Sequence, residues 1–257
     1  MNYLYPYIIS RANSTKKWLG TDCLENYKEV TDFGPNIYKP GDIEYKFNNN
    51  GFRCDEFTLK SEIPIVFLGC SISEGMGLRQ EDVWAYKLLE KIRNKTGKNI
   101  PYWNLGLGAS SIDTQSSNLY LFSKIQPYIQ YVFSYFPPFH RREYCFGNNV
   151  TTAWGPGDQG RHKTLGNIFI DTYFKNHQTN QSLMLIDSIL DKNNTRMYCS
   201  RWGVEDNDFD LFDTFLNMNY FAWPEERLDA ARDGMHHGPA YHAQLADKFW
   251  SIIEHHF

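Results

Sequence analysis

The 257-residue sequence predicts one large α/β domain with three layers, α/β/α, and a central parallel sheet of about five strands. Two patterns support this prediction. From residue 61 onward, short apolar runs alternate with longer amphipathic stretches, which is typical of parallel strands joined by crossover helices. The first run, Ile63–Leu68, is rich in β-branched residues and bounded by polar ones, as expected for a strand buried on both faces.

Composition narrows the class of protein. A net charge of -4 argues against a nucleic-acid partner. The five cysteines are odd in number and contain no Cys-x-x-Cys, so we expect a reducing compartment and no zinc ribbon. The sequence implies no cofactor. The start of the chain has neither the pattern of a signal peptide nor the roughly 20 apolar residues of a membrane span. We therefore expect a cytoplasmic protein without a membrane partner, and the oligomeric state stays open.

The elements follow in order. Residues 1–60 contain many turn formers and little periodicity, which predicts an irregular N-terminal arm packed on a main domain at 61–257. Residues 139–165 form a long insertion, and loops of this length in a compact domain more often have a function than not. The predicted elements are a short strand at Ile43–Phe47, helices at Glu81–Thr96, Ile112 to Tyr128, Thr179–Leu190 and Pro239–His255, and strands at Ile100–Leu105, Gln130–Phe136, Thr195–Cys199 and Asn219–Trp223.

The first strand stops at Gly69, and the small residues that follow include Ser71. In open α/β sheets, ligands bind at the carboxyl edge of the strands, so Ser71 is a candidate nucleophile. The alternative is a plain turn from strand to helix, in which Ser71 or Ser73 caps the helix.

Two further stretches carry candidate chemistry. Asp233 and His236 lie three residues apart in a turn, so the carboxylate can accept from imidazole Nδ1 and leave Nε2 free to take a proton from a serine. The stretch Asn104–Ser110 places small residues at a strand end, where backbone N–H groups can face a reacting oxygen.

Together these stretches resemble the conserved blocks of the SGNH (GDSL-type) hydrolase superfamily over roughly residues 48–257. Gly69–Gly75 matches the first block except that Cys70 replaces an Asp, Asn104–Ala109 resembles the second block, and Asp233–His236 matches the last. The resemblance implies a flavodoxin-like fold and an esterase that forms an acyl-serine intermediate. Ser71 would be the nucleophile, His236 the general base and Asp233 its orienting partner. The backbone N–H groups of Ser71 and of Gly108 or Ala109 would form the oxyanion hole.

The family's third block, Gly-x-Asn-Asp, is missing after the predicted strand that ends at Phe136. The Asn of that block normally supplies one oxyanion donor. His140 and Arg141 are candidate replacements and candidate substrate contacts, as is Trp154, which could stack on a sugar; each could equally be a solvated loop residue. By the same resemblance, the expected substrate is a small-molecule or glycan ester with a short acyl group, such as a carbohydrate O-acetyl ester.

A second hypothesis is a catalytically weak or inactive SGNH-like domain that acts as a binding or structural module. A hydrogen bond between Ser71 Oγ and His236 beside an open pocket would favour the enzyme. A side chain from 137–145 that fills the pocket would favour the binding module. Arg53 is expected to hold the N-terminal arm through an ion pair.

Overall fold

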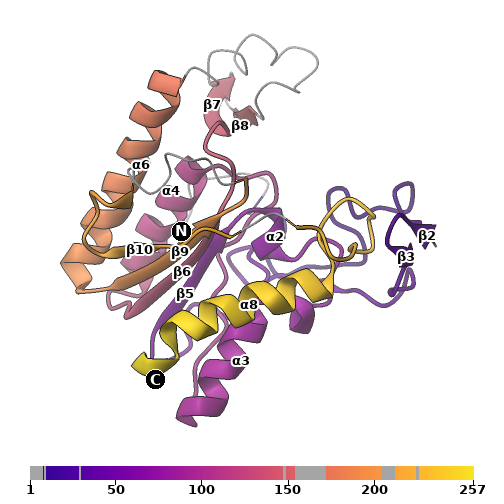
Figure 1. Ribbon diagram of the computed structural model, residues 1–257, viewed down its shortest axis with the longest axis horizontal. Coiled ribbons are helices and arrows are strands. Elements are labelled where there is room, and N and C mark those ends of the chain that lie inside the picture. Colours follow the sequence, from indigo (N-terminus) through magenta and orange to yellow (C-terminus); the bar gives the residue numbers. More distant parts are fainter. Residues whose placement is uncertain are drawn as a thin grey trace.

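A parallel four-stranded sheet lies at the centre of the chain, which is described from a computed structural model (Figure 1). Its spatial order is β10-β9-β6-β5, with β5 at Ile65–Gly69, β6 at Tyr131–Phe136, β9 at Arg196–Arg201 and β10 at Met218–Tyr220. The structure describes residues 8, 10–28, 30–146, 149–153, 172–203, 212–223 and 226–257.

A fifth strand position lies beside β5 on its outer side. Asn104 forms a parallel bridge with Phe67, and Phe67 exchanges backbone hydrogen bonds with Trp103 (2.9 Å) and Leu105 (2.8 Å). The strand predicted at Ile100–Leu105 is therefore present only as this short contact. Counted in chain order, the five positions run 2-1-3-4-5, which is the flavodoxin-like order. The prediction of a parallel sheet of about five strands is confirmed.

Helices cover both faces of the sheet (Figure 1). Helices α3 (Trp84–Thr96) and α8 (Pro239–Ile253) pack together, as do α4 (Ile112–Ile125) and α6 (Thr172–Asn193). Alternate strand residues enter two separate cores. Phe67 and Phe133 are buried with α3 and α8, whereas Val66 and Val132 are buried with α4 and α6. Strands β5 and β6 are thus buried at every position because both faces of the sheet are covered, and the predicted three-layer fold is confirmed.

Local signals account for the ends of several helices. Ser111 caps α4 in a reciprocal capping box with Thr114. Gly97 ends α3 with φ 65, a conformation that costs glycine nothing. Pro239 begins α8, where its missing N–H is not needed. Single-turn helices stand at α2 (Ser71–Glu74), η1 (Gln80–Asp82) and η2 (Glu254–His256).

The insertion at 139–165 is not a plain loop in its described part. Strands β7 (Arg142–Phe146) and β8 (Asn149–Ala153) pair antiparallel, apart from the central sheet. Helix α6 extends beyond the predicted helix Thr179–Leu190 at both ends.

The strands described in the first 60 residues are each two residues long. Strand β1 (Thr15–Lys16) pairs with β4 (Tyr45–Lys46), and β2 (Val30–Thr31) pairs with β3 (Gly34–Pro35). No helix in the part of the chain that can be described is both long and apolar enough to cross a membrane.

Within the described ranges, Arg53 does not make the expected ion pair. Its buried guanidinium instead donates to four backbone carbonyls, those of Glu44 (3.4 Å), Glu74 (3.1 Å), Gly75 (2.7 Å) and Leu78 (2.8 Å). Carbonyls freed where α2 ends need donors, and the Arg53 guanidinium supplies them. Arg53 therefore holds the turn that follows α2.

Candidate active site

Ser71 lies where β5 ends and α2 begins, at the carboxyl edge of the sheet. The turn requires glycine at position 69, since a Cβ there would come within 1.9 Å of Ser73 Oγ, and φ is +152°. The side chain of Cys70 is fully buried, whereas Ser71 lines a pocket. The short turn thus buries the thiol and presents the hydroxyl.

Ser71, His236 and Asp233 form one chain of hydrogen bonds. His236 Nε2 lies 2.9 Å from Ser71 Oγ, and His236 Nδ1 lies 2.6 Å from Asp233 Oδ2. The other oxygen, Oδ1, accepts from the backbone N–H groups of Met235 and His236, each at 3.0 Å. With Nδ1 donating to the carboxylate, Nε2 is the nitrogen that can accept the serine proton. The structure therefore brings together the three residues that the sequence singled out.

The Asp233 carboxyl is almost fully buried, yet it stays ionised at neutral pH. Burial by itself raises the pKa of Asp233, but the hydrogen bonds and charge of His236 and the hydroxyl of Thr21 outweigh it and lower the pKa to about 2. A carboxylate is thus held against the imidazole throughout the physiological pH range.

Thr21 belongs to this hydrogen-bonded set, and the sequence analysis missed it. Its hydroxyl donates to Asp233 Oδ2 at 2.7 Å and lies 3.4 Å from His236 Nδ1. Thr21 comes from the N-terminal arm, outside the stretch that resembles the hydrolase family. The only local signal was the turn-forming sequence Leu19-Gly20-Thr21-Asp22, which indicates a turn but not its partner.

A pocket of about 300 Å³ opens beside Ser71 Oγ. The arm contributes one part of its wall, and the segments after β5, after the bridge at Asn104 and before α8 contribute the rest. The lining residues are Arg11, Leu19, Gly20, Thr21, Ser71, Glu74, Met76, Gly108, Ala109 and His236.

The backbone donors around this pocket differ from the expectation at one position. Gly108 N–H donates to Glu74 Oε2 at 2.6 Å, so it is already occupied. The N–H groups of Ser71 and Ala109 have no acceptor among the described residues. Ala109 has φ 64, a left-handed conformation that is uncommon for a residue other than glycine. Of the two candidate partners for the Ser71 N–H, Ala109 is the one that remains open.

Glu74 is held in place by Arg11, with which it forms a buried ion pair. The guanidinium of Arg11 also lies over the ring of Phe47, 4.1 Å from its centroid. Both side chains line the pocket, and their opposite charges neutralise each other. The sequence did not predict either residue as part of the site, because an isolated Arg or Glu is usually exposed.

Asn104, in the second block, supports the loop and does not line the pocket. Its Nδ2 donates to the carbonyl of Ser73 (2.6 Å) and to the hydroxyl of Tyr102 (2.8 Å), and its Oδ1 accepts from Gly106 N–H (2.9 Å). These bonds fix the loop before Gly108 and Ala109 against α2.

The candidate contacts from the insertion are not brought to the pocket. Neither His140 nor Arg141 is among its lining residues, and Arg141 is buried with its guanidinium 4.9 Å from the ring centroid of Trp202. Trp154 lies outside the described residues. No side chain described at 137–143 fills the pocket, and none replaces the missing Asn.

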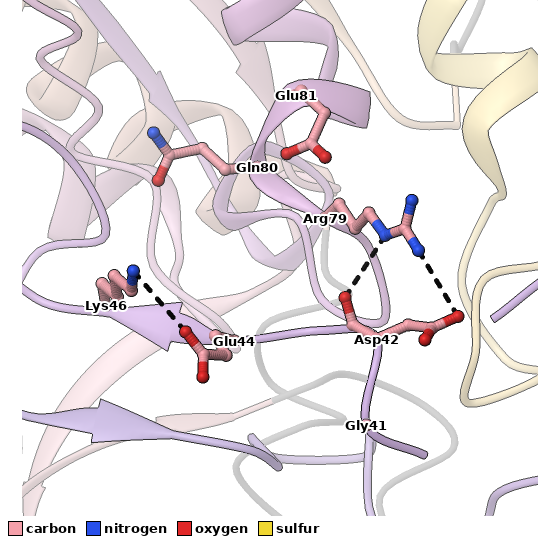
Figure 2. Close-up of a pocket in the computed structure, with 7 residues that line it drawn as sticks. All are labelled: Gly41, Asp42, Glu44, Lys46, Arg79, Gln80 and Glu81. Carbon is pink, nitrogen blue, oxygen red and sulfur yellow. Dashed lines mark hydrogen bonds and ion pairs between the residues drawn. The ribbon is translucent and has the colours of Figure 1, made fainter. Parts of the chain in front are cut away.

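A larger hollow of about 580 Å³ lies elsewhere, between β4 and η1 (Figure 2). Four of its charged side chains form two pairs, Arg79 with Asp42 at 3.4 Å and Lys46 with Glu44 at 3.5 Å, and Glu81 is a further lining carboxylate. It contains no histidine, serine or cysteine. Across the described ranges, no group of three or more His, Cys, Asp or Glu side chains is placed to hold a metal ion. The pocket at Ser71 is therefore the candidate active site.

No protein-family model and no curated protein matches the chain. Among solved structures, the chain is similar to TesA, with 13% identity and a TM-score of 0.48 over 74% of this chain and 97% of that one. It is also similar to the psychrotrophic esterase EstA from Pseudoalteromonas sp., in a structure inhibited by monoethylphosphonate, with 12% identity and a TM-score of 0.49 over 75% and 97%.

The serine stands at the carboxyl end of β5, next to β6, where the strand order of such a sheet reverses and ligands bind. The chain has a three-layer α/β/α fold with the flavodoxin-like strand order, and its sequence blocks resemble those of the SGNH hydrolases.

Proposed function

We propose that the chain is a serine ester hydrolase whose catalytic residues are Ser71, His236 and Asp233. The observation that carries the proposal is the unbroken set of hydrogen bonds from Ser71 Oγ through His236 to Asp233, at 2.9 and 2.6 Å. This arrangement lets one imidazole take the serine proton and later return it to a leaving group. An open pocket beside Ser71 supports the same conclusion.

The reaction proceeds through an acyl-serine intermediate. Ser71 Oγ attacks the ester carbonyl while its proton passes to His236 Nε2. The tetrahedral intermediate collapses, the bond to the alkoxy oxygen breaks, and His236 protonates the departing alcohol. Water then attacks the acyl-serine, again giving its proton to His236. The acid leaves and Ser71 recovers its proton. Asp233 holds the imidazole and stabilises its charged form throughout.

Two backbone groups serve the oxyanion, the N–H of Ser71 and that of Ala109. Both lie on residues that line the pocket, and neither is taken by another acceptor in the described chain. A third donor would be expected in the family's missing block. Since loss of one such donor costs about 10²- to 10³-fold in kcat, turnover is expected to be slow for an enzyme of this class.

The pocket favours a short, uncharged acyl group. Leu19, Met76 and Ala109 provide apolar contacts, and the nearby charges of Arg11 and Glu74 are paired with each other. A volume of about 300 Å³ leaves little room for a long chain beside the reacting ester. An O-acetyl ester of a carbohydrate is our first candidate, and its sugar part rests on the family resemblance alone.

The decisive experiment compares hydrolysis of p-nitrophenyl acetate by the wild type and Ser71→Ala from pH 5 to 9. We expect Ser71→Ala to lose about 10³-fold or more in kcat. Ser123→Ala, on α4 outside the pocket, is the matched control and should keep the wild-type rate.

Mass spectrometry during turnover should find one acetyl group on Ser71. A p-nitrophenyl series of increasing acyl length should show kcat/KM falling beyond short chains. If the wild type and Ser71→Ala release p-nitrophenol at the same background rate, esterase activity is contradicted. The chain would then be better explained as a binding or structural module.

A further inference from the structure

The N-terminal arm reaches the catalytic loop through a tight turn. Leu19 and Asp22 exchange backbone hydrogen bonds at 2.9 and 3.0 Å, so Gly20 and Thr21 form a two-residue turn, with Gly20 at φ 59. Such a short, closed turn leaves little freedom to the side chain of Thr21. The arm therefore presents the Thr21 hydroxyl at a fixed position.

The next residue anchors this turn. Asp22 is fully buried, and both of its oxygens accept from the guanidinium of Arg232, at 2.9 and 2.6 Å. Tyr45 donates a further hydrogen bond to Asp22 at 2.5 Å. Since Arg232 immediately precedes Asp233, two adjacent residues of the arm meet two adjacent residues of the catalytic loop. A bidentate Arg–carboxylate pair sets the geometry of such a junction.

The Thr21 hydroxyl has two possible acceptors. Asp233 Oδ2 lies at 2.7 Å and Met76 Sδ at 3.1 Å. A carboxylate is much the stronger acceptor, so the single proton of Thr21 goes to Asp233. The oxygen that receives it is the one that also accepts from His236 Nδ1. Thr21 thus restrains the carboxylate oxygen that orients the base.

From this geometry we infer that the N-terminal arm is part of the active site, and that Thr21 is a positioning residue for Asp233. The inference rests on the proposed function. Thr21 does not touch the reacting atoms through its hydroxyl; it acts by holding Asp233, and through it His236. Together with Arg11, Leu19 and Gly20, it also makes the arm one wall of the pocket.

The test compares Thr21→Val, which removes the hydroxyl and keeps the shape, with Thr21→Ser, which keeps the hydroxyl. Because Thr21 donates to the carboxylate that orients the base, Thr21→Val should lower kcat by about tenfold or more on p-nitrophenyl acetate. KM should change little, and Thr21→Ser should restore most of kcat. Thr96→Val, at the end of α3 and outside the pocket, is the matched control.

A spectroscopic measurement separates this inference from the proposed function. The Nδ1 proton of His236, bonded to Asp233, should give a downfield proton resonance in the wild type and in Thr21→Ser. That resonance should shift or broaden in Thr21→Val. It does not depend on turnover, so it tests the positioning role even if no ester is hydrolysed.

Two results would overturn the inference. One is wild-type kcat with an unchanged resonance in folded Thr21→Val. The other is equal loss of kcat in Thr21→Val and Thr21→Ser together with lowered melting temperatures in both, which would indicate a purely structural role. If Thr21→Val does not fold, Thr21→Ala removes the same hydroxyl with a smaller side chain. The results expected for Thr21→Ala are those given for Thr21→Val.

Discussion

Ala109 shows how a single residue can be strained at the site. Its φ of 64 places Cβ close to the following carbonyl, a conformation that costs an alanine roughly 1–2 kcal/mol and glycine almost nothing. In the family pattern a glycine aligns best with this position. A glycine at this position would carry the same backbone N–H without that strain.

We expect Ala109→Gly to raise the free energy of unfolding by about 0.5–1 kcal/mol, because relief of the strain exceeds the extra chain entropy of glycine. Ala109→Val should lower it, since a β-branched residue tolerates this conformation still less. Urea unfolding of the three proteins measures both changes. A lower stability for Ala109→Gly than for the wild type would mean that the alanine methyl contributes more by packing than it costs in strain.

At the scale of elements, the Arg11–Glu74 pair joins the N-terminal arm to α2. Glu74 is buried to 1% exposure at the end of that helix, and its second oxygen holds Gly108 of the neighbouring loop. One carboxylate therefore connects three segments around Ser71. A buried charge is tolerated only while its partner is present.

Removing one partner should therefore destabilise the fold strongly. Glu74→Gln leaves the Arg11 charge buried and unpaired, and we expect a loss of about 3–5 kcal/mol in the free energy of unfolding. Arg11→Met should cost a similar amount. The double variant should lose less than the sum of the two, which denaturation of all four proteins in a double-mutant cycle measures. Additive losses would show that the two side chains do not interact.

At the scale of the whole molecule, buried neutral histidines link stability to pH. Burial, with the nearby charge of Arg227, lowers the pKa of His237 to about 4. Burial also lowers the pKa of His242 well below its ordinary value, and its Nδ1 accepts from Trp84 N–H at 3.0 Å at the start of α3. Both side chains are therefore neutral in the folded protein at pH values where an unfolded histidine is charged.

The unfolded chain takes up protons at these positions below about pH 6.5, whereas the folded chain does not. The free energy of unfolding should therefore fall as the pH drops from about 6.5 to 4. The lowered pKa of Asp233, about 2, adds a loss only below about pH 4.

The variant His237→Phe can keep the stacking on Tyr241, whose ring centroid lies 3.8 Å away, and removes the titrating group. It should show a shallower decline between pH 6.5 and 4, as measured by urea unfolding at each pH. Above pH 7 its stability should differ from the wild type by a constant. An equally steep decline in both proteins would assign the pH dependence to other groups.

Much of the fold and the central part of the site could be predicted from the sequence because their signals are local. The apolar run ending at Gly69 marked β5, and the small residues after it marked the turn that presents Ser71. Asp233 and His236 are three residues apart, so a turn alone brings them within hydrogen-bonding distance. The resemblance to the family blocks indicated that a serine and a histidine meet at one edge of the sheet.

Only the tertiary structure decided what completes the site. Thr21 and Asp233 are separated by 212 positions, and neither a polar arm without periodicity nor a single threonine indicates such a partner. Nor does the sequence indicate that Arg11 pairs with Glu74. It therefore could not show that Gly108 N–H, a predicted oxyanion donor, already donates to Glu74. The positions of the buried strands follow from the runs of apolar residues in the sequence. The pairing of buried polar groups follows from where the whole chain places them.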